Sequence, residues 1–210
     1  MKLQLALDRM TIDSAVAVAR STTESVDWVE VGTSLIKEYG KESILAMRRA
    51  LPDKTIVADV KTMDNVRYEF ELCFRAGADV VTLMAAAPSA TIESGIEVAA
   101  EYGKTVILDL LNCPIEDIGR YANRENVILC WHLGKDEQET TGIQANFFKR
   151  AALNHPGTRW AFAGGLSLEN THEAAAHHPH VLIVGSAITS AQNPAQTARK
   201  FRLLIEEVEA

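Results

Sequence analysis

The chain contains the stretch Thr55-Ile56-Val57-Ala58-Asp59-Val60-Lys61-Thr62-Met63-Asp64, an apolar run that ends in charged side chains. The run is typical of a buried strand, so Asp59 and Lys61 come where that strand gives way to a loop. Residues two apart in an extended segment project to one face, and Asp64 follows where a helix would begin. Desolvating two carboxylates and an ammonium is costly, and proteins usually tolerate it to bind a metal or polarise a substrate. The alternative is a surface ion pair beside a helix cap.

Similar apolar runs recur along the whole chain and alternate with amphipathic helical patterns. Eight runs are predicted to be strands, at Leu3–Leu7, Val26–Val31, Thr55–Val60, Asp79–Leu83, Thr105–Leu110, Val127–Trp131, Arg159–Ala163 and Val181–Val184. Helices are predicted near residues 11–22, 41–50, 65–76, 89–102, 115–122, 145–153, 167–176 and 194–208. Strands separated by helices in this way indicate a parallel sheet that is covered on both faces.

Eight strand–helix units favour an α/β fold of the closed (β/α)8 barrel type, in one domain that spans residues 1–210. The rival arrangement, an open doubly wound sheet that binds a dinucleotide, carries a glycine-rich first turn. Here the first turn is Asp8-Arg9-Met10, without the G-x-G-x-x-G pattern. No linker or low-complexity stretch divides the chain. The sequence therefore predicts a single TIM barrel.

The composition excludes several classes of function. A net charge of −7 without a basic cluster argues against a nucleic-acid partner. No apolar run reaches transmembrane length, and the N-terminus has no signal-peptide pattern, so no membrane partner is expected. Three widely spaced cysteines fit neither a disulfide framework nor a zinc site. We therefore expect a cytoplasmic protein with reduced thiols.

In a barrel of this type, catalytic groups lie at the carboxyl ends of the strands. Those ends carry Asp8, Glu30, Asp59 with Lys61, Asp109, His132, Gly164-Gly165 and Gly185-Ser186. Each charged group alone could be a solvated loop residue or a helix cap, and the glycines could serve turn geometry alone. Barrel closure brings all of these residues to one mouth, which favours a shared site.

The residue types at this mouth suggest particular roles. Glu30 and Asp59 lie on neighbouring strands and could hold one Mg²⁺ ion. Glycines after the seventh and eighth strands, Gly164-Gly165 and Gly185-Ser186, let backbone N–H groups approach a phosphate. His132 is the histidine at a strand end and is suited to act as a general acid or base near neutral pH.

Five segments together resemble a known family: Leu5-Ala6-Leu7-Asp8, Val29-Glu30-Val31-Gly32-Thr33, Ala58-Asp59-Val60-Lys61-Thr62-Met63-Asp64, Ala76-Gly77-Ala78-Asp79 and Ala163-Gly164-Gly165. The series resembles the orotidine 5'-monophosphate decarboxylase superfamily over essentially the whole chain. Within it, the chain is similar to the branch of 3-hexulose-6-phosphate synthase and 3-keto-L-gulonate-6-phosphate decarboxylase. Orotidine decarboxylase itself is disfavoured, because its second strand typically ends with Lys where this chain has Glu30.

The resemblance implies a homodimer with shared active sites, in which Asp64 of each subunit completes the site of the other. It also implies Mg²⁺ near Glu30 and Asp59, with Lys61 stabilising an enediolate. The synthase makes that intermediate in aldol chemistry, and the decarboxylase makes it by loss of CO₂. A divalent cation and an ammonium are the groups that stabilise such developing oxyanion charge.

Four positions separate the two activities within the branch. The decarboxylases tend to have Glu, Arg, Thr and Arg where this chain has Asp109, Lys135, Ala163 and Ser186. Three of the four favour the synthase, and so does the stretch from His132 to Gln138, which is similar to H-x-G-x-D-E-Q. Lys135 departs from the synthase pattern, since a cation there is a feature of the decarboxylase.

The resemblance therefore implies a synthase-like, metal-dependent aldolase that condenses formaldehyde with the sugar phosphate D-ribulose 5-phosphate, or runs the reverse cleavage. Asp8 and Asp109 are expected to orient sugar hydroxyls, and Lys61 is expected to stay an ammonium between two acidic groups. Two alternatives stay open, namely the keto-gulonate phosphate decarboxylase and a non-catalytic barrel that binds a sugar phosphate.

Overall fold

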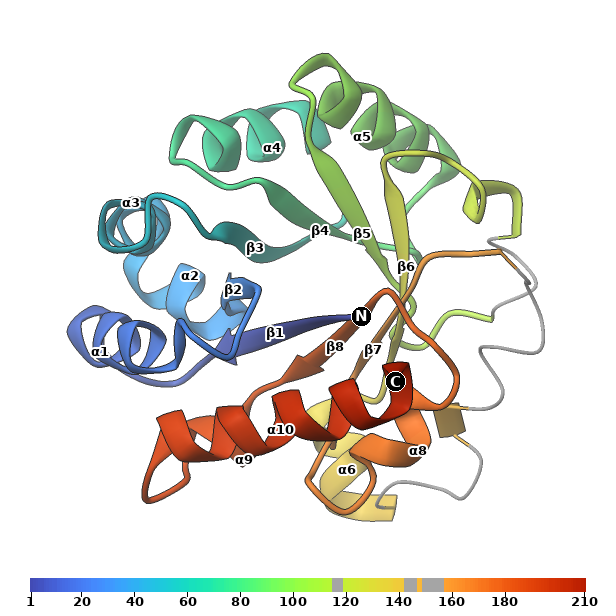
Figure 1. The fold of residues 1–210 in the computed structure, drawn as a ribbon. Helices are drawn as coiled ribbons and strands as arrows, with labels where there is room; N and C mark the ends of the chain where they lie inside the picture. The colour runs from blue at the N-terminus through green and yellow to red at the C-terminus, as the bar shows by residue number, and fades with distance from the viewer. Residues whose placement is uncertain (115–118, 142–146, 149–156) are drawn as a thin grey trace.

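The computed structural model describes residues 1–114, 119–141, 147–148 and 157–210. Eight parallel strands close into a barrel in chain order, so the predicted (β/α)8 architecture is confirmed (Figure 1). The strands are β1 (Lys2–Leu7), β2 (Trp28–Val31), β3 (Thr55–Thr62), β4 (Val80–Met84), β5 (Thr105–Asp109), β6 (Val127–His132), β7 (Trp160–Ala163) and β8 (Val181–Val184). Their starts differ from the predicted ones by at most two residues.

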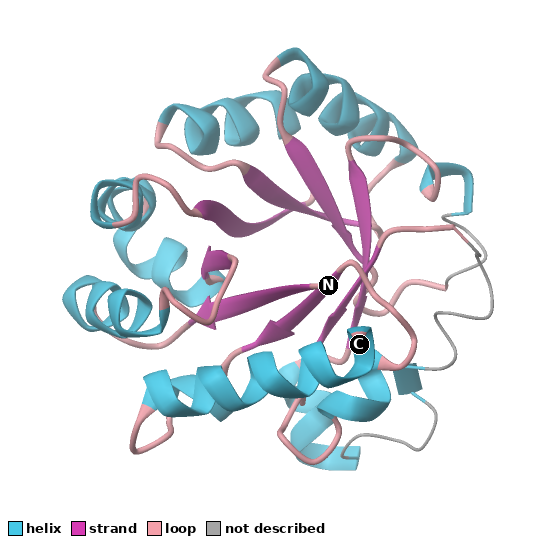
Figure 2. Ribbon diagram, viewed as in Figure 1, coloured by secondary structure: helices cyan, strands magenta, loops and turns pink. Residues whose placement is uncertain are grey.

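Helices surround the strands (Figure 2). They are α1 (Ile12–Thr22), α2 (Thr33–Tyr39), α3 (Lys41–Ala50), α4 (Val66–Arg75), α5 (Ser89–Glu101), α6 (Lys135–Thr141), α8 (Thr171–Ala175), α9 (Ser186–Thr189) and α10 (Pro194–Glu209). Within the described part of the chain, no helix is both long and apolar enough to cross a bilayer.

Three short helices, α2, α6 and α9, were not predicted. Each begins within three residues of a strand end, where a short helix is hard to distinguish from a loop in the sequence. The predicted helix at 167–176 is shorter than expected: the Ser167 N–H binds the side chain of Asn170 at 2.8 Å, and α8 begins only at Thr171. The helices predicted at 115–122 and 145–153 lie largely outside the described residues.

The side chains of each strand alternate between two cores. On β1, Leu3, Leu5 and Leu7 are fully buried in the larger core, which the helices cover. Burying such a side chain contributes about 1.5–3 kcal/mol. The intervening Gln4 pairs in register with Trp28 on β2, which packs against the smaller core inside the barrel. Gln4 therefore points into a barrel interior that is otherwise largely apolar.

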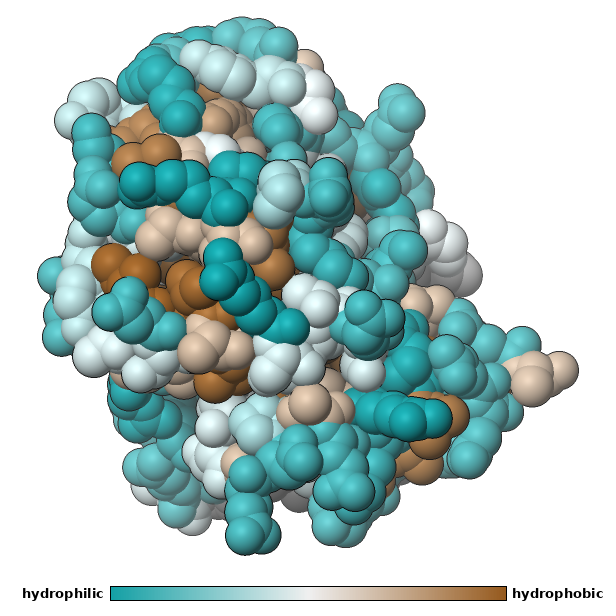
Figure 3. All heavy atoms as spheres, turned by 60° about the vertical axis from the view of Figure 1, so that its left-hand side comes forward, coloured by the Kyte–Doolittle hydropathy of each residue, from teal (hydrophilic) through white to brown (hydrophobic). Residues whose placement is uncertain are grey.

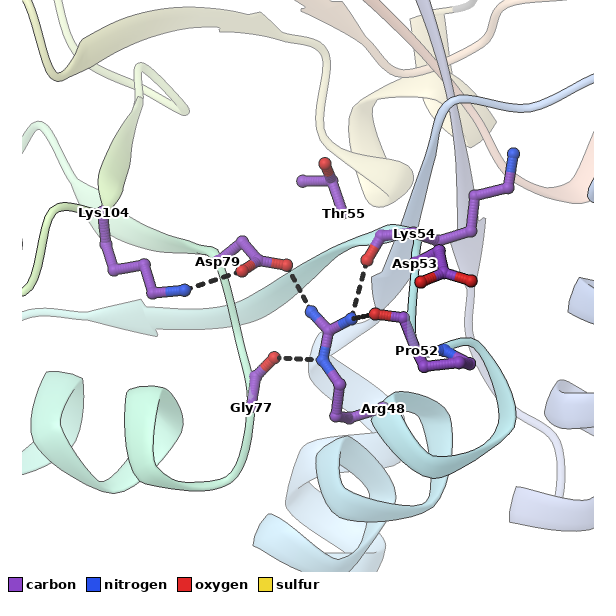
Figure 4. A pocket seen from close by; sticks show the side chains of 8 residues that line it. All are labelled: Arg48, Pro52, Asp53, Lys54, Thr55, Gly77, Asp79 and Lys104. Carbon is purple, nitrogen blue, oxygen red and sulfur yellow. Dashed lines mark hydrogen bonds and ion pairs between the residues drawn. The ribbon is translucent and has the colours of Figure 1, made fainter.

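An arginine joins two loops at the amino-terminal ends of the strands (Figure 4). Arg48 on α3 donates from Nε to the carbonyl of Gly77 at 2.9 Å. Its Nη1 donates to the carbonyls of Pro52 and Lys54 at 2.8 and 2.9 Å. These bonds satisfy carbonyl groups that would otherwise lose their water partners on folding.

Arg48 also binds the carboxylate of Asp79, which lies just before β4. Asp79 further accepts hydrogen bonds from Lys104 Nζ at 2.7 Å and from the N–H of Ile56 at 3.0 Å. Although burial opposes ionisation, these partners hold the pKa of Asp79 below its usual range. A hollow of about 380 Å³ lies beside this network. Because the network is at the end opposite the catalytic mouth of a barrel, we assign it to stability.

We expect Arg48→Met to lower the free energy of unfolding by about 1–2 kcal/mol, because several charged hydrogen bonds to mostly half-buried partners are lost together. Arg49→Met is the matched control. The side chain of Arg49 is 72% exposed, and its carboxylate partner, Glu42, lies 3.9 Å away. Urea titration of both variants measures the difference. Equal losses would contradict the role given to Arg48.

Candidate active site at the carboxyl ends of the strands

Asp59 and Lys61 meet at the end of β3. Lys61 Nζ lies 2.9 and 2.7 Å from the two carboxylate oxygens of Asp59, which confirms that these side chains converge. The expected regular extended geometry is wrong, however. The register with β4 shifts between Ala58 and Thr62, and Lys61 has a φ of +51°, so the strand bulges here. Bulges re-aim side chains and are common beside active sites.

Two threonines complete the surroundings of Asp59. Thr33 Oγ1 donates to one oxygen at 2.5 Å, and Thr82 Oγ1 donates to the other at 2.8 Å. Thr82 also accepts the N–H of Lys61 at 2.9 Å, which anchors the bulge to β4. Sequence analysis missed both threonines, because Thr is an ordinary strand residue and a common first residue after a helix cap.

Asp109 links Lys61 to His132. Its carboxylate lies 3.3 Å from Lys61 Nζ and 2.8 Å from His132 Nδ1, and it accepts the N–H of Leu111 at 2.9 Å. Burial opposes the charge on Asp109, but His132, Lys61 and this N–H together lower its pKa. An ionised Asp109 accepts the proton of Nδ1, which leaves Nε2 of His132 as the basic nitrogen.

Lys61 remains charged, as expected. Burial alone would lower its pKa, but the carboxylates of Asp59 and Asp109 raise it above its usual value. The ammonium is therefore a fixed positive charge that faces the interior of the mouth. Cys130, two residues before His132, lies inside the barrel, where burial raises the pKa of its thiol well above the usual value. It is a neutral packing group.

Of the three buried carboxylates Glu30, Asp59 and Asp109, Glu30 has the fewest hydrogen-bond and ion-pair partners among the described residues. It is 7% exposed, and its pKa is raised well above the usual value, first by burial and then by the negative charge of Asp59. The amide of Gln4 donates a hydrogen bond to one of its oxygens. Gln4 is a further residue that sequence analysis missed, although a polar side chain inside an apolar strand was a visible signal.

This pair of carboxylates fits a hard divalent cation. The described residues contain no group of three or more His, Cys, Asp or Glu side chains that could hold a metal. Mg²⁺ does not require one, because it keeps waters and substrate oxygens in its other positions and is often bound through one or two carboxylates. Glu30 and Asp59 repel each other, and a cation between them would relieve that repulsion.

Asp8 is tied to the start of α2. Its Oδ1 accepts the backbone N–H of Ser34 at 3.0 Å and the hydroxyl of Ser34 at 2.6 Å, so it caps a helix whose own N-cap residue is Gly32. A Cβ on Gly32 would lie 2.3 Å from this carboxylate, which explains the glycine. The role of Asp8 toward sugar hydroxyls stays a prediction.

The glycines after β7 have a structural reason of their own. Gly164 and Gly165 have φ values of +90° and +73°, and a Cβ on Gly164 would lie 2.1 Å from the carbonyl oxygen of Leu133. After β8, Gly185 and Ser186 lead directly into α9. These positions expose backbone at the strand ends, and phosphate binding there stays a prediction.

Asp64 and Lys135 lie outside the central network. Asp64 is exposed, and no hydrogen bond or ion pair with another described residue engages it. Lys135 is the first residue of α6 and pairs with Glu139 one turn later at 3.2 Å.

A second hollow of about 310 Å³ lies at the same rim of the barrel. Segments that follow β4 and β5 line it, and no predicted site residue does.

We expect Glu30→Gln to raise the melting temperature in EDTA at pH 7, because the charged carboxylate is disfavoured by burial and by Asp59. A raised carboxyl pKa makes the folded state bind the proton more readily than the unfolded state. The contribution of Glu30 to wild-type stability therefore declines as pH rises from about 4.5 toward the raised pKa, and the variant lacks that contribution.

Melting curves between pH 4 and 8 measure this effect, with Glu97→Gln on the exposed face of α5 as the matched control. A Glu30→Gln protein that melts below wild type at pH 7 in EDTA would contradict the repulsion argument.

Comparison with known proteins places this geometry in context. Residues 1–201 match the family model described as orotidine 5'-phosphate decarboxylase / HUMPS family. The 3-hexulose-6-phosphate synthase of Mycobacterium gastri is 34% identical over 98% of this chain and 100% of its own length. The crystal structure of 3-hexulose-6-phosphate synthase from Salmonella typhimurium matches with a TM-score of 0.94 and 34% identity, covering 99% of this chain and all of that one.

A decarboxylase is also similar. The crystal structure of 3-keto-L-gulonate-6-phosphate decarboxylase from Vibrio cholerae matches with a TM-score of 0.86 at 28% identity, covering 99% of this chain and 98% of that one. Proteins named for both activities thus share this fold, and the two synthases named above have the higher identity to this chain.

Proposed function

The chain belongs to the orotidine 5'-phosphate decarboxylase / HUMPS family, and from that premise we propose that it is a 3-hexulose-6-phosphate synthase-type aldolase. It would condense formaldehyde with D-ribulose 5-phosphate, or run the reverse cleavage. The observation that carries the proposal is the continuous chain of contacts from Asp59 through Lys61 and Asp109 to His132. That arrangement combines a fixed cation with a positioned base, which is what enediolate chemistry requires.

The residues of the site support a complete reaction. Nε2 of His132 takes a proton from C1 of the pentulose, and the electrons left on carbon delocalise into the carbonyl as an enediolate. The ammonium of Lys61 stabilises its negative oxygen. C1 then attacks the carbon of formaldehyde, a C–C bond forms, and the new alkoxide takes the proton back from His132. Asp109 holds the imidazole in the orientation that both transfers need.

Mg²⁺ is the cofactor that we propose, with Glu30 and Asp59 as its protein ligands. When bound, the ion supplies positive charge toward the oxygens of the substrate. The position of Glu30 and Asp59 on the neighbouring strands β2 and β3 supports this assignment, as does the raised pKa of Glu30, which is due to burial and then to the charge of Asp59. Glycines 164, 165 and 185 with Ser186 are proposed to bind the phosphate, because they present backbone beside the strand ends.

The decarboxylase is the second candidate. Lys135 is the observation that favours it, because a cation at this position suits a departing carboxylate. In the structure, however, Lys135 is half exposed and its charge is balanced by Glu139. The higher identity to synthases supports the aldolase, as do Asp109, Ala163 and Ser186. A non-catalytic barrel would have no need of the strained backbone at Lys61.

Purified protein with Mg²⁺ is expected to consume formaldehyde only when ribulose 5-phosphate is present. EDTA should abolish turnover and added Mg²⁺ should restore it, since the two carboxylates would be left without their cation. Release of CO₂ from 3-keto-L-gulonate 6-phosphate, measured in parallel, separates the two enzymes. Faster CO₂ release than formaldehyde consumption would favour the decarboxylase, and neither reaction would favour the binding protein.

We also propose a homodimer in which Asp64 acts in the site of the partner subunit. Asp64 is flanked by two exposed apolar side chains, Met63 at 47% and Tyr68 at 60% exposure. Figure 3 shows hydrophobic residues gathered among hydrophilic ones on the side of the molecule that lies at the left in Figure 1. Exposed apolar groups that gather on one face are typical of interaction surfaces, which supports assembly.

Subunit mixing tests the shared site. Lys61→Ala and Asp64→Ala homodimers should each be nearly inactive, because every site lacks one group. Random exchange makes about half of the dimers mixed, and each mixed dimer has one intact site, so about one quarter of wild-type activity should return. Exchange is verified with two affinity tags. If activity stays absent in verified heterodimers, Asp64 does not act across an interface.

A further inference from the structure

We infer that Gln4 is the positioning residue for Glu30, holding one carboxylate oxygen so that the other is presented to Mg²⁺. This inference rests on the proposed function, because it assigns a role toward the proposed cation. Gln4 lies on β1 and Glu30 on the neighbouring β2, and the Gln4 amide nitrogen donates to Oε2 of Glu30.

The placement of Gln4 is costly unless it serves a purpose. It is 1% exposed and faces a barrel interior whose other members include Val57, Val80 and Ile107. The side-chain amide oxygen of Gln4, Oε1, has no hydrogen-bond partner within the described residues. A buried amide with one unsatisfied atom destabilises the fold by about 1–3 kcal/mol. An apolar residue would avoid the unsatisfied oxygen but would deprive Glu30 of its hydrogen bond, so the reason for the glutamine lies in Glu30 and not in packing.

The two proposed metal ligands are supported very differently. Asp59 accepts hydrogen bonds from Thr33, Thr82 and Lys61, which engage both of its oxygens. Among the described residues, Gln4 is the one hydrogen-bond partner of Glu30, and it engages a single oxygen. The other oxygen of Glu30 is therefore left for a ligand. Within the described residues, the amide of Gln4 is thus the one hydrogen-bond donor that orients this carboxylate.

Partners that orient metal ligands typically change metal affinity by 10–100-fold when they are removed. Gln4→Met keeps the length and approximate volume of the side chain but deletes the donor. We expect it to weaken binding of Mg²⁺, and of Mn²⁺ as a spectroscopic probe, by about 10–100-fold. Since Gln4 does not contact the Lys61–His132 network, kcat at saturating Mg²⁺ should stay within about twofold of wild type while the Mg²⁺ concentration for half-maximal rate rises.

The experiment measures metal binding directly, without substrate. EDTA-stripped wild type, Gln4→Met and Gln4→Asn are titrated with Mg²⁺ by calorimetry and with Mn²⁺ by electron paramagnetic resonance. Gln4→Asn retains an amide that is one methylene too short to reach Glu30, so it should lose affinity as well. Thr22→Val is the matched control, because Thr22 is equally buried but bonds only to carbonyls within α1. It should bind both ions as wild type does.

The outcomes separate the two proposals. Weaker binding by both Gln4 variants, with wild-type circular dichroism spectra, supports the positioning role. Wild-type affinity in a folded Gln4→Met protein overturns that role and leaves the metal site standing. Absence of binding by wild type overturns the metal assignment itself. Failure of both Gln4 variants to fold, while Thr22→Val folds, would show that Gln4 is a structural residue and overturn the inference.

Discussion

Barrel closure forces like charges together, and the structure is organised around that constraint. Parallel strands carry Glu30, Asp59 and Asp109 to one mouth, where each carboxylate is less than a tenth exposed. Charges of one sign in a low dielectric are tolerated only with compensating cations and hydrogen bonds. Lys61 is the central compensation, since its ammonium contacts both Asp59 and Asp109. Glu30 forms no ion pair with it and retains the largest uncompensated cost of the three, which supports the proposed Mg²⁺ ion between Glu30 and Asp59.

The two ends of the barrel divide stability and chemistry between them. At the amino-terminal ends, Arg48 and Asp79 satisfy each other, and Arg48 also satisfies carbonyls of two loops. At the carboxyl ends, Lys61 has a strained backbone in a bulged strand, and Glu30 is charged at a cost. The fold tolerates the strained backbone and the buried charge at the carboxyl ends because hydrogen bonds and ion pairs stabilise the amino-terminal ends. Barrels generally place stability at one end and catalysis at the other in this way.

The sequence predicted the fold well because barrel strands are buried on both faces, and their apolar runs are visible without any tertiary information. It also predicted which charges converge, since strand ends must share one level. It could not predict the bulge at Lys61, because the register depends on Thr82 of the neighbouring strand. Thr33 and Thr82 gave no signal of a role in the site, because threonine is common in strands and at helix starts. Gln4 was recognisable in principle, as a polar side chain between Leu3 and Leu5 in a strand with both faces buried, yet its partner is known only from the structure.

Within this family, the site itself does not separate an aldolase from a decarboxylase. In the proposed chemistry both reactions pass through an enediolate, and the contacts that join Asp59, Lys61, Asp109 and His132 would serve that intermediate in either case. Selectivity has to come from groups that meet the one-carbon unit as it arrives or departs. A departing carboxylate is best served by a cation with no other partner, whereas Lys135 is already paired with Glu139 on the same helix. We therefore propose that the pairing of Lys135 with Glu139 on α6, more than the network of Asp59, Lys61, Asp109 and His132, determines which carbon unit the site handles.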